Sequence, residues 1–268
     1  MLTALASRCV RLPPVRATRV RLKRAMVAPE ATSMPGQKAL DPPVKLPDKS
    51  RGFLLTLPEQ NAWWKVHAAT EAVALLQQTW RELNPDAPPP TFEPMAVLDA
   101  PGALFVAQKD NGVQAATGDP VHVTHALMEG VIKDPSKGRI GEHLMRLVPV
   151  EDCSGSSIAD VETMAKRVLP KHFQAGGDKA AEKPGGLFAV RPEVHSPRLQ
   201  DTTVNDLVRR VADAVPRDYK VELSSTPHEG RKTIVLACCG QNVCMAVVDD
   251  FHAFHRYNVQ ELRKVAQD

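Results

Sequence analysis

Residues 143–173 read HLMRLVPVEDCSGSSIADVETMAKRVLPKHF. The apolar run from Leu144 to Val150 predicts a strand. Three serines follow it, and serine is a favourable residue at the start of a helix. We therefore predict a helix from Ile158 to Leu169, which Pro170 ends. A strand followed at once by a helix is the building unit of an α/β fold.

The same alternation continues to the carboxyl end. Two apolar runs are separated by Gly240-Gln241-Asn242, a turn of hairpin length rich in turn-forming residues. One further segment has Val204, Leu207 and Val211 on a single helical face. The predicted elements are strands at 187–190, 219–223, 233–239 and 243–248, and helices at 204–215 and 253–265.

The preceding part of the chain predicts a similar, smaller layer. A short apolar run at 53–57 ends at Pro58 and is typical of a buried strand. A helix, a proline-rich loop at 85–94, a second strand and a second helix are expected before Leu144. This order indicates an α/β (α+β) protein whose first part is ferredoxin-like. The predicted helices are 64–80 and 121–132, and the second strand is 102–107.

The amino-terminal segment is strongly basic. Residues 1–28 carry seven Lys or Arg and no acidic residue, a composition that resembles an organelle transit peptide. A disordered basic tail that contacts RNA or directs nuclear import has the same composition, and Met26 is a second candidate start, so these interpretations stay open. We predict that residues 1–50 are disordered. The expected location is the nucleus, the nucleolus or the cytoplasm, with an organelle as the alternative.

Charge is divided unequally along the chain. Residues 1–50 hold ten of the 34 Lys and Arg residues but three of the 31 Asp and Glu residues, so the remainder has a formal charge of −4. Bulk charge therefore does not favour nucleic-acid binding, and an RNA site has to be a local patch or the basic arm. No apolar run approaches the length of about 18 residues that a membrane span requires.

Motifs of nucleotide-binding and hydrolytic enzymes are absent from the sequence. It contains no GxGxxG, P-loop, GxSxG or HExxH, so we expect neither a catalytic site nor a bound cofactor. Five cysteines without CxxC spacing argue against a disulfide framework and a standard zinc site. Adjacent Cys238 and Cys239 are expected to pack on opposite faces of a strand. His252 and His255 are expected on a solvated or RNA-facing helix edge, without metal.

Three stretches of the chain resemble a THUMP domain. They are RLVPVEDC at 146–153, FAVR at 188–191 and VVDDFHAFHRYNVQEL at 247–262. They are most similar to the stand-alone THUMP proteins that act as adaptors for tRNA cytidine acetylation, and the resemblance covers roughly residues 100–265. RGFLLTL at 51–57 is similar to the family's first strand. The following Leu57-Pro58-Glu59-Gln60 departs from the family's usual basic and acidic residues.

This resemblance implies a fold and a role. The fold is a ferredoxin-like domain at 51–145 followed by a THUMP domain with a carboxyl-terminal helix at 146–268. The role is that of a non-catalytic protein, expected to be a monomer, that binds serine and leucine tRNA and presents it to an RNA cytidine acetyltransferase. That partner enzyme uses acetyl-CoA and ATP to form N4-acetylcytidine.

Two other roles are compatible with the same residues. The first is a THUMP RNA-binding protein that serves a different RNA-modifying enzyme. The second is a fragment of a larger tRNA-modifying enzyme, because THUMP domains often accompany methyltransferase, thiolation or deaminase domains. The chain has no room for such a catalytic domain, so this second alternative requires a longer transcript.

RNA helices are contacted mainly through phosphates and 2′-hydroxyls, for which Arg, Lys and His are suitable. Arg191 matches a basic position at the end of the family's THUMP strand. We expect it to form a phosphate grip with His195 and Arg198, extended by Arg209 and Arg210 on the next helix. The net charge is then expected to be segregated, with a basic face around Arg191 and Arg209 and an acidic face opposite.

Further candidates lie around the strand at 144–150. Arg139, His143 and Arg146 precede or begin it and form a second basic group. Lys166 and Lys171 lie near the end of the helix at 158–169, where favourable interaction with the helix dipole explains them nearly as well.

Aromatic residues are scarce, at 4% of the chain. Trp63 and Trp64 are able to stack on bases, but at least one of them is expected in the core. Near the carboxyl end, Tyr257 is expected to pack and Asn258 to cap or brace a turn.

Overall fold

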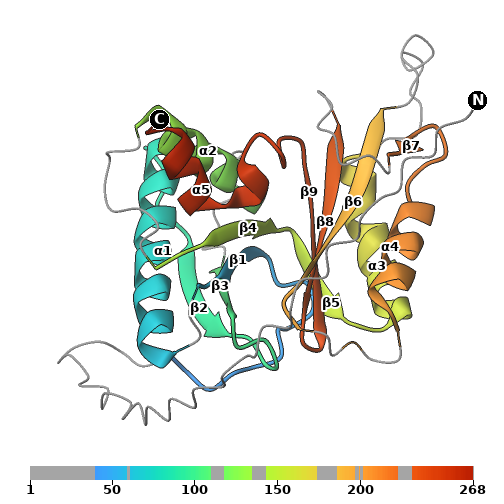
Figure 1. The fold of residues 1–268 in the computed structure, drawn as a ribbon, viewed down its shortest axis with the longest axis horizontal. Helices are drawn as coiled ribbons and strands as arrows, with labels where there is room; N and C mark the ends of the chain where they lie inside the picture. Colours follow the sequence, from blue (N-terminus) through green and yellow to red (C-terminus); the bar gives the residue numbers. More distant parts are fainter. Residues whose placement is uncertain are drawn as a thin grey trace, which may run out of the picture. The chain divides into compact units, whose positions relative to one another are not determined.

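The computed structural model describes residues 40–58, 61–109, 118–134, 143–173, 186–196, 199, 202–222 and 231–267. These residues form two β-sheets and five α-helices, so the expected mixed α/β architecture is confirmed (Figure 1). Within them, no helix combines the length and the apolar character that crossing a bilayer requires.

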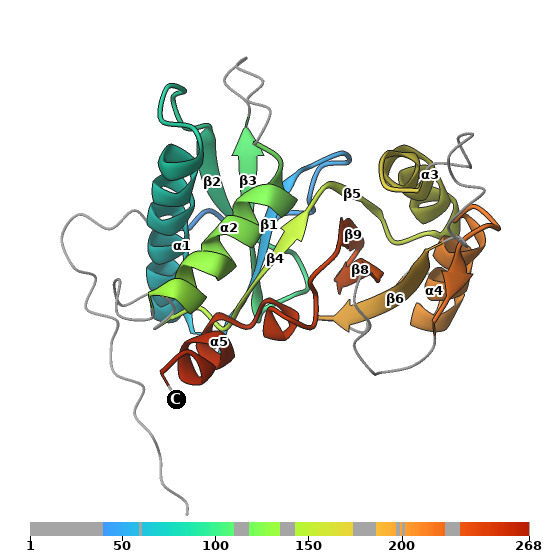
Figure 2. The same cartoon turned by 90° about the horizontal axis from the view of Figure 1, so that it is seen from above.

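The first sheet is antiparallel throughout and has the strand order β2-β3-β1-β4. Along the chain its elements follow the order β-α-β-β-α-β, which is the order that a ferredoxin-like interpretation requires. Two helices cover one face of the sheet (Figure 2). The elements are β1 (Gly52–Thr56), α1 (Ala62–Leu83), β2 (Thr91–Ala96), β3 (Ala103–Lys109), α2 (Pro120–Lys133) and β4 (Arg146–Val150).

The proline-rich loop predicted at 85–94 is wrong in its second half. Strand β2 begins at Thr91 and pairs with β3, although it contains Pro94. β2 forms the edge of the sheet, where a residue without an N–H group does not interrupt the pairing of a central strand. Proline content alone therefore concealed a strand.

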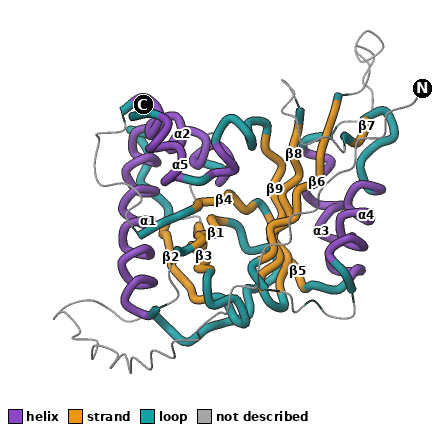
Figure 3. Tube along the Cα trace, in the orientation of Figure 1, coloured by secondary structure: helices purple, strands orange, loops and turns teal. Residues whose placement is uncertain are grey.

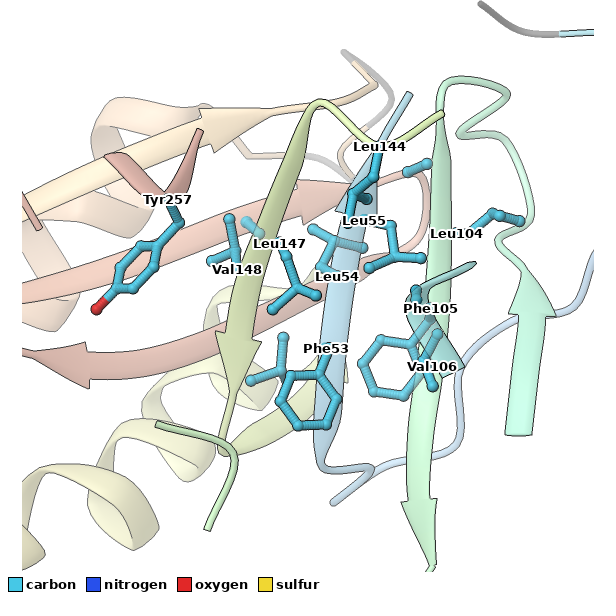
Figure 4. Packing of buried hydrophobic residues seen from close by; sticks show 14 of the residues in the cluster. Phe53, Leu54, Leu55, Leu104, Phe105, Val106, Leu144, Leu147, Val148 and Tyr257 are labelled. Carbon is cyan, nitrogen blue, oxygen red and sulfur yellow. The ribbon is translucent and has the colours of Figure 1, made fainter. Parts of the chain in front are cut away.

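Strand β1 lies at the centre of the first core. Phe53, Leu54 and Leu55 are all fully buried, although consecutive strand residues point to opposite faces. Figure 4 shows them between side chains of β3 and β4. Both faces of β1 are therefore covered by other parts of the protein.

The second sheet has the order β5-β9-β8-β6-β7 and is mixed. Helices α3 and α4 pack against one face of it (Figure 2). The Ser157 hydroxyl accepts a hydrogen bond from the Asp160 amide at the start of α3, as the serine-rich sequence predicts. The elements are β5 (Asp152–Gly155), α3 (Ile158–Val168), β6 (Leu187–Val194), α4 (Val204–Asp213), β7 (Lys220–Val221), β8 (Lys232–Cys239) and β9 (Asn242–Val248).

The β8–β9 hairpin is apolar on both faces. Cys238 packs in the core under α3 and α4, whereas Cys239 packs in the core of the first sheet, which confirms their predicted opposite orientation. Burial raises the pKa of the Cys238 thiol to about 12, so this thiol stays protonated. Gly240 has a φ of +60° in the connecting turn, where an added Cβ would collide with the carbonyl oxygen of Leu98.

The carboxyl-terminal helix differs from its prediction. Residues 251–254 form turns, His255–Tyr257 is a 3₁₀ turn, and helix α5 spans only Val259–Val265. The helix predicted at 253–265 is therefore wrong in its first part (Figure 3). Asn258 caps α5 by accepting a hydrogen bond from the Glu261 amide at 3.1 Å, and Tyr257 is buried, so both of these expectations are confirmed.

The described structure begins upstream of Arg51, the residue at which order was expected to start. Leu46 is buried, and its backbone N–H and C=O groups both bond to the Asn242 side chain, at 2.9 and 3.0 Å. The prediction of disorder for residues 1–50 is therefore wrong for residues 40–50. Residues 1–39 lie outside the described part. The predicted domain limits at 51–145 and 146–268 stay predictions. Strand β4 lies in the second of these ranges, although it belongs to the first sheet.

Gly52 provides a test of the packing around β1. Its φ is +154°, and an added Cβ would collide with the Val106 carbonyl oxygen, so Gly52→Ala is expected to lower the free energy of unfolding by about 3 kcal/mol. Gly130 has no atom near the equivalent position, so Gly130→Ala is expected to stabilise the protein by about 0.5 kcal/mol. Urea unfolding measures both, and equal stability of the two variants would contradict this packing.

Candidate RNA-binding interface

The face of the second sheet opposite α3 and α4 carries charged residues on β6. Phe188 and Val190 pack in the core beneath the two helices, so the alternate residues Arg191 and Glu193 lie on the other face. In the parallel pairing of β6 with β8, Arg191 lies beside Val235. Val235 belongs to the core of the first sheet, which confirms that Arg191 is on the side without helices.

Four basic residues form what we call the cationic cluster: Arg191, Arg231, His252 and Arg256. Burial lowers the pKa of Arg191, and the positive charges of Arg231 and Arg256 lower it further. The pKa of His252 is lowered by burial and then by the same three guanidinium groups. Arg191 and His252 thus both lie within the electrostatic influence of Arg231 and Arg256.

Arg231 anchors the cluster and is almost completely buried. Its guanidinium bonds to the Glu222 carboxylate at 3.0 Å, which compensates one of the positive charges. Arg256 is exposed and Arg191 is half-buried. Arg256 and part of Arg191 are therefore the members of the cluster that solvent reaches.

Arg146 of the first sheet lies next to this cluster. Its side chain donates a hydrogen bond to Glu193 at 2.7 Å, and its backbone forms a β-bridge with Asn258, two residues after Arg256. Burial and the nearby Arg146 charge lower the pKa of His195 to about 4, so its imidazole is neutral at physiological pH. Nε of Arg146 and Nε2 of His195 are buried, and neither makes a hydrogen bond within the described part of the chain.

The predicted RNA-contact residues are thus only partly brought together. Arg146, Arg191 and His195 share one region, whereas Arg209 and Arg210 lie on α4, on the other side of the sheet. Arg210 pairs there with Glu162 of α3 at 3.6 Å. The expected single basic face around Arg191 and Arg209 is therefore wrong, because β6 separates the two side chains.

The remaining predicted residues lie elsewhere. Lys166 and Lys171 are exposed at the end of α3, and Lys171 lines a cavity of about 750 Å³ beside α2. His143 belongs to a group of aromatic rings at the start of α1. Arg139 and Arg198 lie outside the described residues.

Two members of the cationic cluster were not identified from the sequence. Arg231 lies 40 positions after Arg191, and only the parallel pairing of β6 with β8 brings them together. Arg256 was interpreted as part of a structural signature, although a carboxyl-terminal turn presents it beside the sheet. The one available signal for Arg231 was its place just before the strand predicted at 233–239.

The chemistry of this face is that of anion binding. Guanidinium groups bind phosphate oxygens through paired, charge-assisted hydrogen bonds. In the part of the chain that the structure describes, no group of three or more His, Cys, Asp or Glu side chains is arranged to hold a metal ion. The cationic cluster and Arg146 are therefore the described groups best suited to a polyanion.

Comparison with known structures gives remote likenesses. A Pyrococcus horikoshii Ot3 protein, PH1313, matches with a TM-score of 0.44 and 10% identity over 74% of this chain and 55% of that chain. A 4-thiouridine synthetase solved as an RNA complex with ATP matches with a TM-score of 0.39 and 7% identity over 74% of this chain and 41% of that chain. At these TM-scores the likenesses support no conclusion about function.

Curated protein sequences give a clearer relationship, although no family model matches the chain. THUMP domain-containing protein 1 of Bos taurus is 23% identical over 56% of this chain and 39% of its own length. The Mus musculus protein of the same name is 22% identical over the same shares. An uncharacterized Schizosaccharomyces pombe protein is 24% identical over 63% of this chain and 51% of its own length. The chain thus spans about half the length of these relatives or less, and it is distantly similar to THUMP domain-containing protein 1 over that part.

Proposed function

We propose that this protein is a non-catalytic tRNA-binding adaptor. It presents serine and leucine tRNA to a separate RNA cytidine acetyltransferase, which forms N4-acetylcytidine. In this role the protein acts as a monomer in the nucleus, the nucleolus or the cytoplasm. The family relationship supports the link to tRNA modification, and the sequence contains no nucleotide-binding or hydrolytic motif of its own.

The observation that carries the RNA-binding part is the cationic cluster on the helix-free face. Its arginines come from β6, from the residue before β8 and from the carboxyl-terminal turn, so the tertiary fold is needed to assemble it. Arginines in such proximity repel one another, and a bound phosphate chain relieves that repulsion. Residues 51–268 have a negative formal charge, so the cationic cluster is a local concentration of positive charge.

The acetyltransferase remains the proposed source of catalysis. An adaptor has to hold the tRNA while leaving the target cytidine accessible to the enzyme. Contacts with phosphates position an RNA without reading its bases, so they satisfy this requirement. The proposal therefore assigns recognition to this chain and chemistry to its partner.

The first prediction concerns tRNA affinity. The double variant Arg191→Gln/Arg256→Gln is expected to bind tRNA about 10- to 100-fold more weakly, because two charge-assisted contacts are lost. The slope of log affinity against log salt concentration is expected to fall by about two. A titration with the full chain at two salt concentrations measures both quantities.

The matched control has the same change of charge on the opposite side of the sheet. Arg209→Gln/Arg210→Gln on α4 is expected to bind tRNA with nearly the wild-type affinity. If this pair is the damaging one, the RNA face lies over α3 and α4. If neither pair matters, the folded body does not contain the binding site.

The second prediction concerns the adaptor role. Cells without this protein are expected to lose N4-acetylcytidine from serine and leucine tRNA, and the wild-type chain restores it whereas Arg191→Gln/Arg256→Gln does not. Mass spectrometry of nucleosides from purified tRNA measures this. Unchanged acetylation, with another tRNA modification reduced, would instead indicate a THUMP protein that serves a different enzyme.

A further inference from the structure

Four aromatic rings gather where helix α1 begins. The Trp63 ring centroid lies 4.0 Å from that of His67, 5.5 Å from that of His143 and 5.8 Å from that of Trp64. The rings of His67 and His143 are stacked, with centroids 5.1 Å apart. We call these four residues the aromatic cluster.

The tryptophans of the chain have different surroundings. Trp80 is buried, and the Trp64 indole donates a hydrogen bond to the His143 carbonyl oxygen at 2.8 Å, so both have a structural role. Trp63 is 48% exposed and is the only aromatic residue among the exposed large apolar side chains of the described part. Core packing therefore does not account for it.

The exposed ring is held in place from beneath. Trp63 lies on the first turn of α1, directly against His67, which in turn lies on His143. His143 is fixed by Glu71, whose carboxylate accepts a hydrogen bond from the His143 backbone amide at 3.1 Å. A ring supported in this way loses little side-chain entropy when a second flat ring stacks on its outer surface.

Charges of both signs lie near the aromatic cluster, since the Glu71 carboxylate is 3.3 Å from Nδ1 of His143 and the positive end of the α1 dipole lies beside Trp63. The first turn of α1 contains no acidic residue, so the positive end of the helix dipole beside Trp63 is not neutralised by an acidic side chain there. His143 lies three residues before Arg146, a distance of at most about 10 Å along the chain. Arg146 in turn adjoins the cationic cluster through Glu193 and Asn258.

We infer that Trp63 is a stacking platform for an unpaired nucleobase of the RNA whose phosphates lie on the cationic cluster. This inference rests on the proposed RNA-binding function and adds a requirement to it: the preferred RNA has a single-stranded nucleotide next to its helix. The base contacts the outer surface of the Trp63 indole. Its phosphate lies toward the amino-terminal end of α1 or toward Arg146.

A nucleobase fits these surroundings better than a side chain of a protein partner. A nucleotide has an aromatic base and a phosphate, so one ligand matches both the exposed ring and the positive end of the α1 dipole beside it. An apolar side chain would match the ring alone. A protein partner therefore becomes an alternative outcome of the test.

The test compares two RNAs and four forms of the full-length protein. The RNAs are a blunt-ended hairpin and the same hairpin with a short single-stranded extension at its 3′ end. The proteins are the wild type, Trp63→Leu, which keeps an apolar side chain without an aromatic face, Trp63→Phe, which keeps a smaller aromatic face, and Ile132→Ala. Ile132 is another exposed apolar residue, on α2, and serves as the control for loss of surface area.

The expected result is specific to the extended RNA. Trp63→Leu is expected to weaken binding of the extended hairpin by about 5- to 100-fold, with the affinity for the blunt hairpin unchanged. Trp63→Phe is expected to recover most of the lost affinity, and Ile132→Ala to behave as the wild type. Quenching of tryptophan fluorescence by the extended hairpin is expected to diminish in both Trp63 variants.

Three results would overturn the inference. Equal binding of both RNAs by the wild type, or an equal loss for both RNAs in Trp63→Leu, excludes a stacking site for an unpaired base. Normal RNA binding by Trp63→Leu with reduced binding to the acetyltransferase assigns Trp63 to a protein interface. Absence of RNA binding in the wild type refutes the proposed function itself and is thus distinguishable from failure of the platform alone.

Discussion

Burial of both faces of the β8–β9 hairpin is the constraint on which the rest of the structure depends. Alternate residues of the two strands enter different cores, as Cys238 and Cys239 do in β8 and Val243 and Cys244 do in β9. One face of the hairpin is covered by α3 and α4, and the other packs with the first sheet and the carboxyl-terminal segment. The hairpin thereby joins the two sheets mainly through apolar contact, and the Arg146–Glu193 hydrogen bond adds a polar link between them.

This arrangement determines where charge is tolerated. Near β9 both faces of the second sheet are covered, and every residue of β9 after Asn242 is apolar. Toward β6 the helix-free face is only partly covered, and Arg191 and Glu193 take the alternate positions. The carboxyl-terminal turn then adds Arg256, whose φ of +57° is unusual for a residue with a side chain. Repulsion between arginines and a strained turn both cost stability, and such costs are concentrated at functional sites.

Much of the fold follows from local sequence patterns. The helix from Ile158, the hairpin turn at Gly240 and the cap at Asn258 each depend on neighbouring residues, and the structure agrees with all three. Strand β2 was missed because its pairing with β3 outweighs the low strand propensity of Pro94 at a sheet edge. The predicted last helix was too long, because the residues before Val259 form turns and a 3₁₀ turn instead of an α-helix.

The candidate site was less predictable than the fold, for a physical reason. Arg191 was identified from a family motif, but its neighbours Arg231 and Arg256 come from segments far apart in the sequence, and strand order alone decides which of them meet. Conversely, Arg209 follows Arg191 closely along the chain and yet lies beyond the sheet, because a crossover helix packs on the opposite face.

Hydrogen exchange of the full-length protein with and without tRNA tests the central claim most directly. The account predicts slower exchange in β6 (187–194) and in residues 251–257 when tRNA is bound, with α3 (158–168) and α4 (204–213) unchanged. Slower exchange confined to α3 and α4, or confined to the basic residues 1–39, would contradict an RNA site at the cationic cluster.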